Sequence, residues 1–92
     1  MEHLSIKEIH DRLEELKGWE LIGNEITKEF KFDSFKEAME YAQKVGKEAE
    51  REHHHHDILI RYKKVTITLT THDANGLTYK DFKLARIIEQ LV

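Results

Sequence analysis

Apolar residues near the start of the chain recur at intervals of three and four, which is the period of one face of an amphipathic helix. This stripe consists of Ile6, Ile9, Leu13 and Leu16. Ser5 and Glu8 have the spacing of a capping box at the start of a helix, and Gly18 stands where a left-handed glycine commonly ends one. We therefore expect a first helix of about three turns between Ser5 and Gly18.

The same period predicts two further helices. Ser34 and Glu37 repeat the capping-box spacing, and an apolar stripe follows them to about Glu52. Its members are Phe35, Ala38, Ala42, Val45 and Ala49. Thr78 and Asp81 can cap a third helix. The apolar positions of that helix are Phe82, Ala85, Ile88 and Leu91. Each helix has a single apolar face, so each must pack against another layer.

Alternating apolar and polar residues predict two hairpins between the helices. The first joins residues 19–22 to residues 26–32, and the second joins residues 58–62 to residues 65–70. His72 has the parity of the threonines in the second hairpin, so it should project from the less apolar face if the strand continues. The order α-β-β-α-β-β-α predicts an α+β fold, in which a four-stranded antiparallel sheet carries three helices on one face.

Composition narrows the possible functions. The 15 Lys and Arg residues against 18 Asp and Glu residues give a net charge of −3 and a pI of about 6.1, which argues against direct binding of nucleic acid. The chain has no cysteine, which excludes thiolate metal ligands and a cysteine nucleophile. The longest apolar run, residues 58–60, is too short for a membrane span or a signal peptide, so we expect a cytoplasmic protein.

No internal repeat or proline-rich linker divides the chain, so we expect residues 1–92 to form a single domain. A domain of this size buries only about 60 to 65% of the surface that its unfolded form exposes. Such a small core makes self-association favourable, and we expect a homodimer or a homotetramer.

Histidine is unusually frequent, with seven copies in the chain. Four of them form the run 53–56, and His72 follows the second hairpin. A purification tag, a solvated loop and a metal site are three interpretations of the run, but tags usually lie at a terminus, and neighbouring histidines rarely converge on one ion. The fourth interpretation is acid–base catalysis, because imidazole has an unperturbed pKa of about 6.5 and exchanges protons near neutral pH.

The spacing around the run favours acid–base catalysis. Glu50 lies four residues before His54 and would share a helical face with it if the second helix persisted that far, so its carboxylate could orient the imidazole. His72 would reach the same pocket from the end of a strand. Asp81 would be a further polar member of that pocket, or only the cap of the third helix.

The motif formed by these residues resembles the signature of the pterin-4a-carbinolamine dehydratases. The matching positions, in order, are Glu50, His54, His55, Tyr62, His72 and Asp81. Segments 18–20, 30–35, 65–69 and 76–77 also resemble family segments, so the resemblance covers nearly the whole chain. It implies the same order of elements and the dehydration of 4a-hydroxytetrahydropterins to quinonoid dihydropterins, which recycles a tetrahydropterin and requires no metal and no cofactor.

The resemblance also implies roles for individual residues. His55 and His72 are expected to supply the acid and the base, in an order that the motif leaves open, and His54 to position the substrate or share the proton transfer. Other residues are expected to contact the pterin through side chains or backbone. They are Glu50, His56, Thr71, Asp73, Ala74 and Asp81.

Three positions depart from the family pattern. His56 stands where the family usually has proline, so the loop is either less restrained or provides an additional imidazole. His53 replaces an acid that many relatives carry, which changes the local charge. Ile58 and Leu59 replace an aromatic pair, so substrate stacking or core packing should differ here.

Two other functions fit the same fold. One is a non-catalytic dimerisation module, since a mammalian relative serves as a partner of a homeodomain transcription factor. The other is a dehydratase-like protein that acts on or binds another pterin, including molybdopterin-related compounds. The histidines favour catalysis over the module, because a pure scaffold has no chemical need for them. The sequence does not separate the two pterins.

Overall fold

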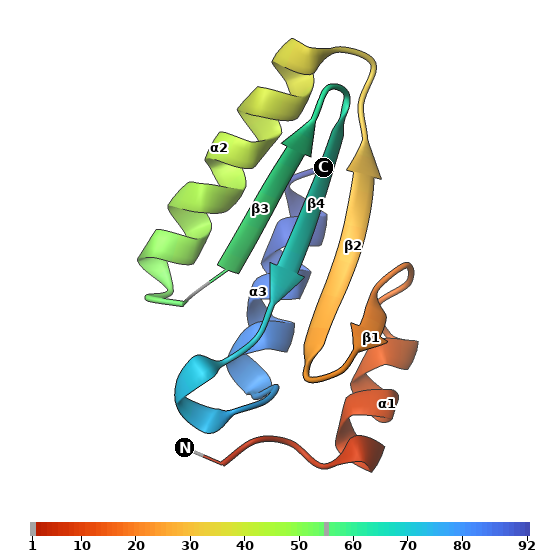
Figure 1. Ribbon diagram of the computed structural model, residues 1–92, viewed down its shortest axis with the longest axis vertical. Coiled ribbons are helices and arrows are strands. Elements are labelled where there is room, and N and C mark those ends of the chain that lie inside the picture. The colour runs from red at the N-terminus through yellow and green to blue at the C-terminus, as the bar shows by residue number, and fades with distance from the viewer. Residues whose placement is uncertain (1, 55) are drawn as a thin grey trace.

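A four-stranded antiparallel sheet forms one layer of the protein, and the helices cover one of its faces (Figure 1). The computed structural model describes residues 2–54 and 56–92, and within these it contains three α-helices, four strands and one short 3₁₀ helix. The helices are α1 (Ile6–Glu14), α2 (Phe35–Arg51), η1 (His72–Ala74) and α3 (Tyr79–Gln90). The strands are β1 (Glu20–Ile22), β2 (Glu25–Lys31), β3 (His56–Arg61) and β4 (Lys64–Leu69). The predicted α+β fold and its order of elements are confirmed.

The sheet has the strand order β1-β2-β4-β3, so β4 is paired on both sides and β1 and β3 are its outer strands. Side chains alternate between two faces along β4, as the pattern predicted. Val65, Ile67 and Leu69 are fully buried beneath the helices. On the opposite face Thr27 of β2 lies beside Thr68, with 3.1 Å between their hydroxyl oxygens.

The first helix ends earlier than predicted. Ser5 and Glu8 form the expected capping box, but the C-cap is Glu15 in a right-handed conformation, and its N–H bonds back into the helix. Gly18 is not the cap: it has a φ of +90° in the turn that leads into β1. Leu16 is buried beyond the helix, because this turn folds it onto the core.

Packing of α2 also differs from its predicted stripe at one position. Phe35 is 49% exposed, since it is the first residue of the helix, whereas Tyr41 is buried in its place. The Tyr41 ring lies 5.1 Å from the Phe30 ring, and its hydroxyl donates to the Ile88 carbonyl oxygen at 3.2 Å. Burial raises the pKa of Tyr41 well above its usual range, and the nearby Glu89 carboxylate raises it further. One tyrosine therefore joins α2, the sheet and α3.

Candidate active site

The first two residues of the histidine run, His53 and His54, close the C-terminal end of α2. The His53 N–H bonds to the Glu50 carbonyl and the His54 N–H to the Ala49 carbonyl, both at 3.1 Å, and His53 has a φ of +52°. This is a Schellman motif with histidine at the left-handed position that glycine usually occupies. The chain leaves the helix before His54, so the predicted helical pairing of Glu50 with His54 is not formed. Glu50 is exposed and His54 is buried.

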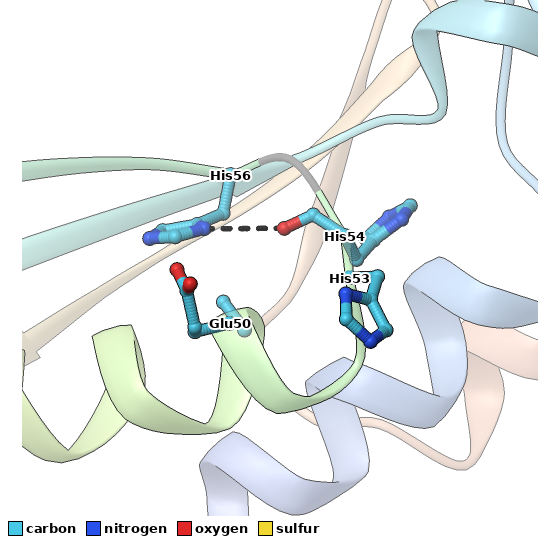
Figure 2. Close-up of a pocket in the computed structure, with 5 residues that line it drawn as sticks. Glu50, His53, His54 and His56 are labelled. Carbon is cyan, nitrogen blue, oxygen red and sulfur yellow. Dashed lines mark hydrogen bonds between the residues drawn. The ribbon is translucent and has the colours of Figure 1, made fainter.

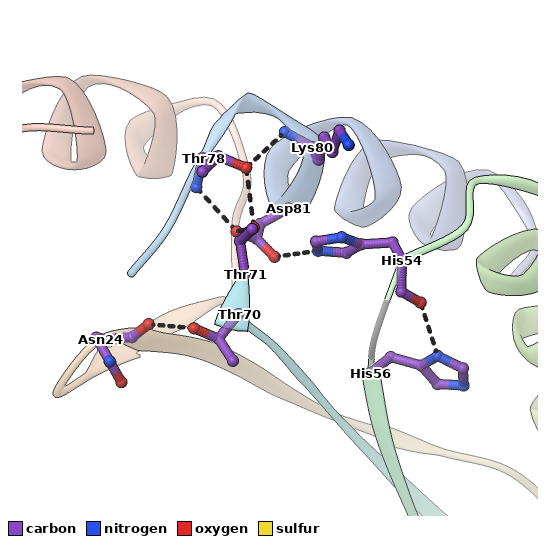
Figure 3. Close-up of polar contacts among 8 residues, drawn as sticks. All are labelled: Asn24, His54, His56, Thr70, Thr71, Thr78, Lys80 and Asp81. Atoms are coloured by element: carbon purple, nitrogen blue, oxygen red, sulfur yellow. Dashed lines mark hydrogen bonds and ion pairs between the residues drawn. The ribbon is translucent and has the colours of Figure 1, made fainter. Parts of the chain in front are cut away.

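The imidazole of His54 turns away from Glu50 and into the protein, where it meets α3 (Figures 2 and 3). Its Nε2 atom bonds to Oδ1 of Asp81. The two side chains are 5% and 0% exposed, respectively. A carboxylate so deeply buried must have close polar partners, because burying an unpaired charge costs several kcal/mol or more. Asp81, rather than Glu50, is therefore the carboxylate that orients His54.

Two threonines hold the other oxygen of this carboxylate (Figure 3). Oδ2 of Asp81 accepts from the Thr71 hydroxyl at 2.8 Å and from the Thr78 backbone N–H at 2.9 Å. The two threonine hydroxyl oxygens lie 2.9 Å apart, and that of Thr78 also accepts from the Lys80 N–H at 3.3 Å. Asp81 is the third residue of α3, where the helix dipole favours negative charge. One carboxylate thus caps a helix and orients a histidine.

A hollow of about 400 Å³ lies at the C-terminal end of α2, next to this network (Figure 2). Its lining consists of Ala49, Glu50, His53, His54 and His56. His56 is half-buried at the start of β3, and its Nδ1 lies 3.4 Å from the His54 carbonyl oxygen. The Glu50 carboxylate points toward the His56 ring. Small-molecule pockets are commonly about 300 to 1,000 Å³, so a bicyclic heterocycle is of a suitable size.

The segment after β4 lies on the other side of Asp81. Thr71 is buried and pairs with Gly76 in an isolated bridge, with an N–H to O distance of 3.1 Å. His72, Asp73 and Ala74 form η1, with the first two exposed and Ala74 buried. The strand ends at Leu69, so the condition under which strand parity predicted a face for His72 is not met. A backbone bond from the Asn75 N–H to the His72 carbonyl turns the chain there instead.

The structure brings only part of the predicted site into direct contact. Asp81 bonds to both His54 and Thr71 and so connects the two histidine-bearing segments. His55 lies outside the described residues. Tyr62, which belongs to the motif, is 71% exposed in the β3–β4 turn. It follows the far end of β3 from His56, which places it about 20 Å from the hollow.

One residue of the network was not predicted as part of the site. Thr78 contributes its N–H to Asp81 and its hydroxyl to the contact with Thr71. The sequence showed the capping spacing of Thr78 and Asp81. That spacing does not predict that Thr78 is only 1% exposed or that its partner lies beside a histidine. In residues 2–54 and 56–92 no three His, Asp or Glu side chains are grouped as a metal site requires. No helix there is long and apolar enough to cross a bilayer.

The fold is a small α+β domain, and its candidate site is a histidine held by a buried aspartate. A family model described as "Pterin 4 alpha carbinolamine dehydratase" matches residues 2–91. The chain belongs to the pterin-4a-carbinolamine dehydratase family, and it is a hydro-lyase.

Individual relatives agree with this assignment over almost their full length. The chain is 47% identical over 92 residues to a protein of Sulfurisphaera tokodaii assigned as a pterin-4-alpha-carbinolamine dehydratase, covering 100% of this chain and 99% of that one. It is 50% identical over 88 residues to one so assigned from Cyanothece sp., covering 96% and 91%. A crystal structure described as a transcriptional coactivator/pterin dehydratase from Brucella melitensis superposes with a TM-score of 0.93 at 33% identity, covering 97% of both chains.

Proposed function

We propose that this protein dehydrates 4a-hydroxytetrahydropterin to quinonoid dihydropterin and water by histidine acid–base catalysis, which recycles the tetrahydropterin cofactor of aromatic amino acid hydroxylation. The observation that carries the proposal is His54, held by the buried Asp81 beside a hollow of about 400 Å³. The family supplies the substrate class.

The reaction requires one proton donor and one proton acceptor. The C4a–O bond breaks as an acid protonates the departing hydroxyl, which leaves as water. A base removes the N5 proton, and the electrons of that N–H bond form the C4a–N5 double bond. Protons are conserved, so imidazole groups are sufficient for this chemistry. His55 and His72 are the proposed acid and base, and His54 positions the substrate or shares the transfer.

The remaining site residues would surround the pterin. Glu50 and His56 line the hollow and would face the hydrogen-bonding edge of the ring. Three residues after β4 would contribute backbone groups; they are Thr71, Asp73 and Ala74. Asp81 acts through His54, because both of its carboxylate oxygens are already bound to protein donors.

The decisive experiment follows the decay of enzymatically generated 4a-hydroxytetrahydropterin by ultraviolet absorbance, with catalytic amounts of the protein. Wild type should accelerate the decay, and His72→Ala should lose roughly 10²- to 10⁴-fold in rate, which is the usual contribution of one acid–base group. Circular dichroism must show that the variant is folded. If wild type gives no acceleration, the proposal fails, and a different pterin becomes the first substrate to test.

We further infer that the protein acts in the cytoplasm as a homodimer or a homotetramer. Its outer strands β1 and β3 support this, because the free edge of a sheet offers backbone groups that a second copy can pair with. Sedimentation equilibrium at micromolar concentration tests the assembly. A purely monomeric species would contradict it.

A further inference from the structure

We propose that Thr71 is a positioning residue that acts through Asp81 to keep the proton of His54 on Nε2, so that Nδ1 is the nitrogen left for proton exchange with the substrate. The first half of this proposal concerns the free protein, and the second half rests on the proposed function. Thr71 is expected above only to line the pterin site, so this assigns it a different role.

The contacts of Asp81 determine where the hydrogen atoms around it lie. Oδ2 accepts from both the Thr71 hydroxyl and the Thr78 N–H, which leaves that oxygen no room for a proton. Oδ1 faces Nε2 of His54. An ionised carboxylate at the first turn of α3 satisfies all of these contacts as an acceptor. Nε2 of His54 must then be the donor.

The two threonine hydroxyls set the direction of the series of hydrogen bonds. Thr71 has one hydroxyl proton, and it is donated to Asp81. The contact between the two threonine hydroxyls is therefore a donation from Thr78 to Thr71. The Thr78 hydroxyl oxygen accepts from the Lys80 N–H, so its own proton remains available for donation to Thr71. Each proton is used once in the series Thr78 to Thr71 to Asp81, with His54 donating from the other side (Figure 3).

This assignment determines which ring nitrogen is left for chemistry. Nε2 is held by Asp81, which leaves Nδ1 as the ring nitrogen available for proton exchange. His54 is also one of the residues that line the hollow at the end of α2. In neutral His54 the Nδ1 atom carries the lone pair and can accept a proton, and after protonation it becomes the donor.

Thr71 is the member of the network at which this can be tested most cleanly. Thr78 is also the N-cap of α3, so its removal would damage the helix. Valine at position 71 keeps nearly the same shape but removes one of the two donors to Oδ2, inside a site where Asp81 is 0% exposed. The carboxylate is then under-satisfied, which favours transfer of the shared proton from Nε2 of His54 to Oδ1, while Nδ1 takes up one proton from solvent. The pair then consists of a neutral carboxyl and the Nδ1–H form of the ring.

Nitrogen-15 NMR of histidine-labelled protein reads the tautomer directly, with His54→Gln used to assign the signal. Wild type should show a proton on Nε2 of His54. Thr71→Val should populate the Nδ1–H form and lower kcat roughly 10- to 100-fold, with a much smaller change in KM. Thr71→Ser, which restores the hydroxyl, should return the tautomer and kcat to near their wild-type values. Thr68→Val is the matched control, since it removes a threonine–threonine contact on the open face of the sheet and should change neither.

The outcomes separate this inference from the proposed function. A wild-type His54 protonated on Nδ1 alone overturns the inference, and so does a folded Thr71→Val with an unchanged tautomer. If that variant does not fold, the wild-type and serine spectra still decide the tautomer. An Nε2–H tautomer in a wild type without dehydratase activity would retain the network but refute the proposed function.

Discussion

At the scale of single residues, Asp81 has two structural roles. It closes the capping box of α3 and, with its other oxygen, binds His54. Because α3 is fixed by its apolar face, the orientation of the histidine is determined by the packing of the helix. A rigid element thus supports the imidazole, which is the arrangement that catalytic groups require.

His56 stands at the position where the resemblance to the family leads us to expect proline. It begins β3, an outer strand, and its ring reaches back to the His54 carbonyl at 3.4 Å. Proline is tolerated at the first residue of an edge strand. We therefore expect His56→Pro to fold and to retain kcat within about threefold, because the contact of His56 with the His54 carbonyl is weak. Loss of its proposed contact with the pterin should raise KM instead.

The measurement is steady-state dehydratase kinetics, with His56→Ala as the matched control. Alanine removes the ring without restraining the backbone, so it separates the two effects. A loss of 10²-fold or more in both variants would show that the additional imidazole takes part in catalysis.

At the scale of elements, the backbone conformation of His53 has an energetic cost that glycine at this position would avoid. It adopts the left-handed conformation at the end of α2, with a φ of +52°, which costs most residues about 1 to 2 kcal/mol relative to glycine. His53→Gly should therefore raise the free energy of unfolding by about 1 kcal/mol and Tm by roughly 4 to 8 °C.

Thermal unfolding followed by circular dichroism measures this effect. Lys47→Gly is the control, since it places glycine in the exposed interior of the same helix and should destabilise by about 1 kcal/mol. An unchanged or lower Tm for His53→Gly would mean that its ring contributes contacts which offset the backbone strain.

The ends of the elements also show where sequence reasoning succeeds. Capping boxes and apolar stripes are local, so the order of elements could be predicted from residues such as Ser5 and Ser34. The end of a helix depends on how the chain turns next. The prediction that Gly18 caps the first helix was therefore wrong, and the left-handed His53 at the end of α2 was not predicted. The link between His54 and Asp81 spans 27 residues, and spacing alone cannot show which of two carboxylates will be buried beside the histidine.

At the scale of the whole molecule, polar contacts join α3 to β2 and to the segment that precedes β1. The Trp19 indole N–H donates to Glu89 on α3 at 3.0 Å, and Glu89 also pairs with Lys28 of β2. The Lys28 ammonium in turn donates to the Lys17 carbonyl at 3.0 Å. These contacts fix the C-terminal half of α3 against β2, while Asp81 fixes its first turn. The helix that carries Asp81 is therefore held at both ends.

Tyr41 should make the stability of the whole fold sensitive to alkaline pH. Its hydroxyl is buried and bonded to the Ile88 carbonyl, and its pKa is raised in the folded state. Above pH of about 10, the unfolded chain releases this proton while the folded chain retains it. The unfolded state then binds fewer protons, so the free energy of unfolding must fall as pH rises. Below that pH, the contribution of Tyr41 is complete.

Tyr41→Phe should change both the level and the slope of this dependence. At neutral pH it should cost about 0.5 to 1.5 kcal/mol, because the hydrogen bond to α3 is lost. Above pH of about 10, its stability should decline less steeply than that of wild type, because the linked proton is absent. Urea unfolding from pH 7 to 11, followed by Trp19 fluorescence, gives both quantities. Tyr79→Phe, which removes the hydroxyl of an exposed ring, should leave the neutral-pH value unchanged. Parallel curves for wild type and Tyr41→Phe would show that ionisation of Tyr41 does not drive alkaline unfolding.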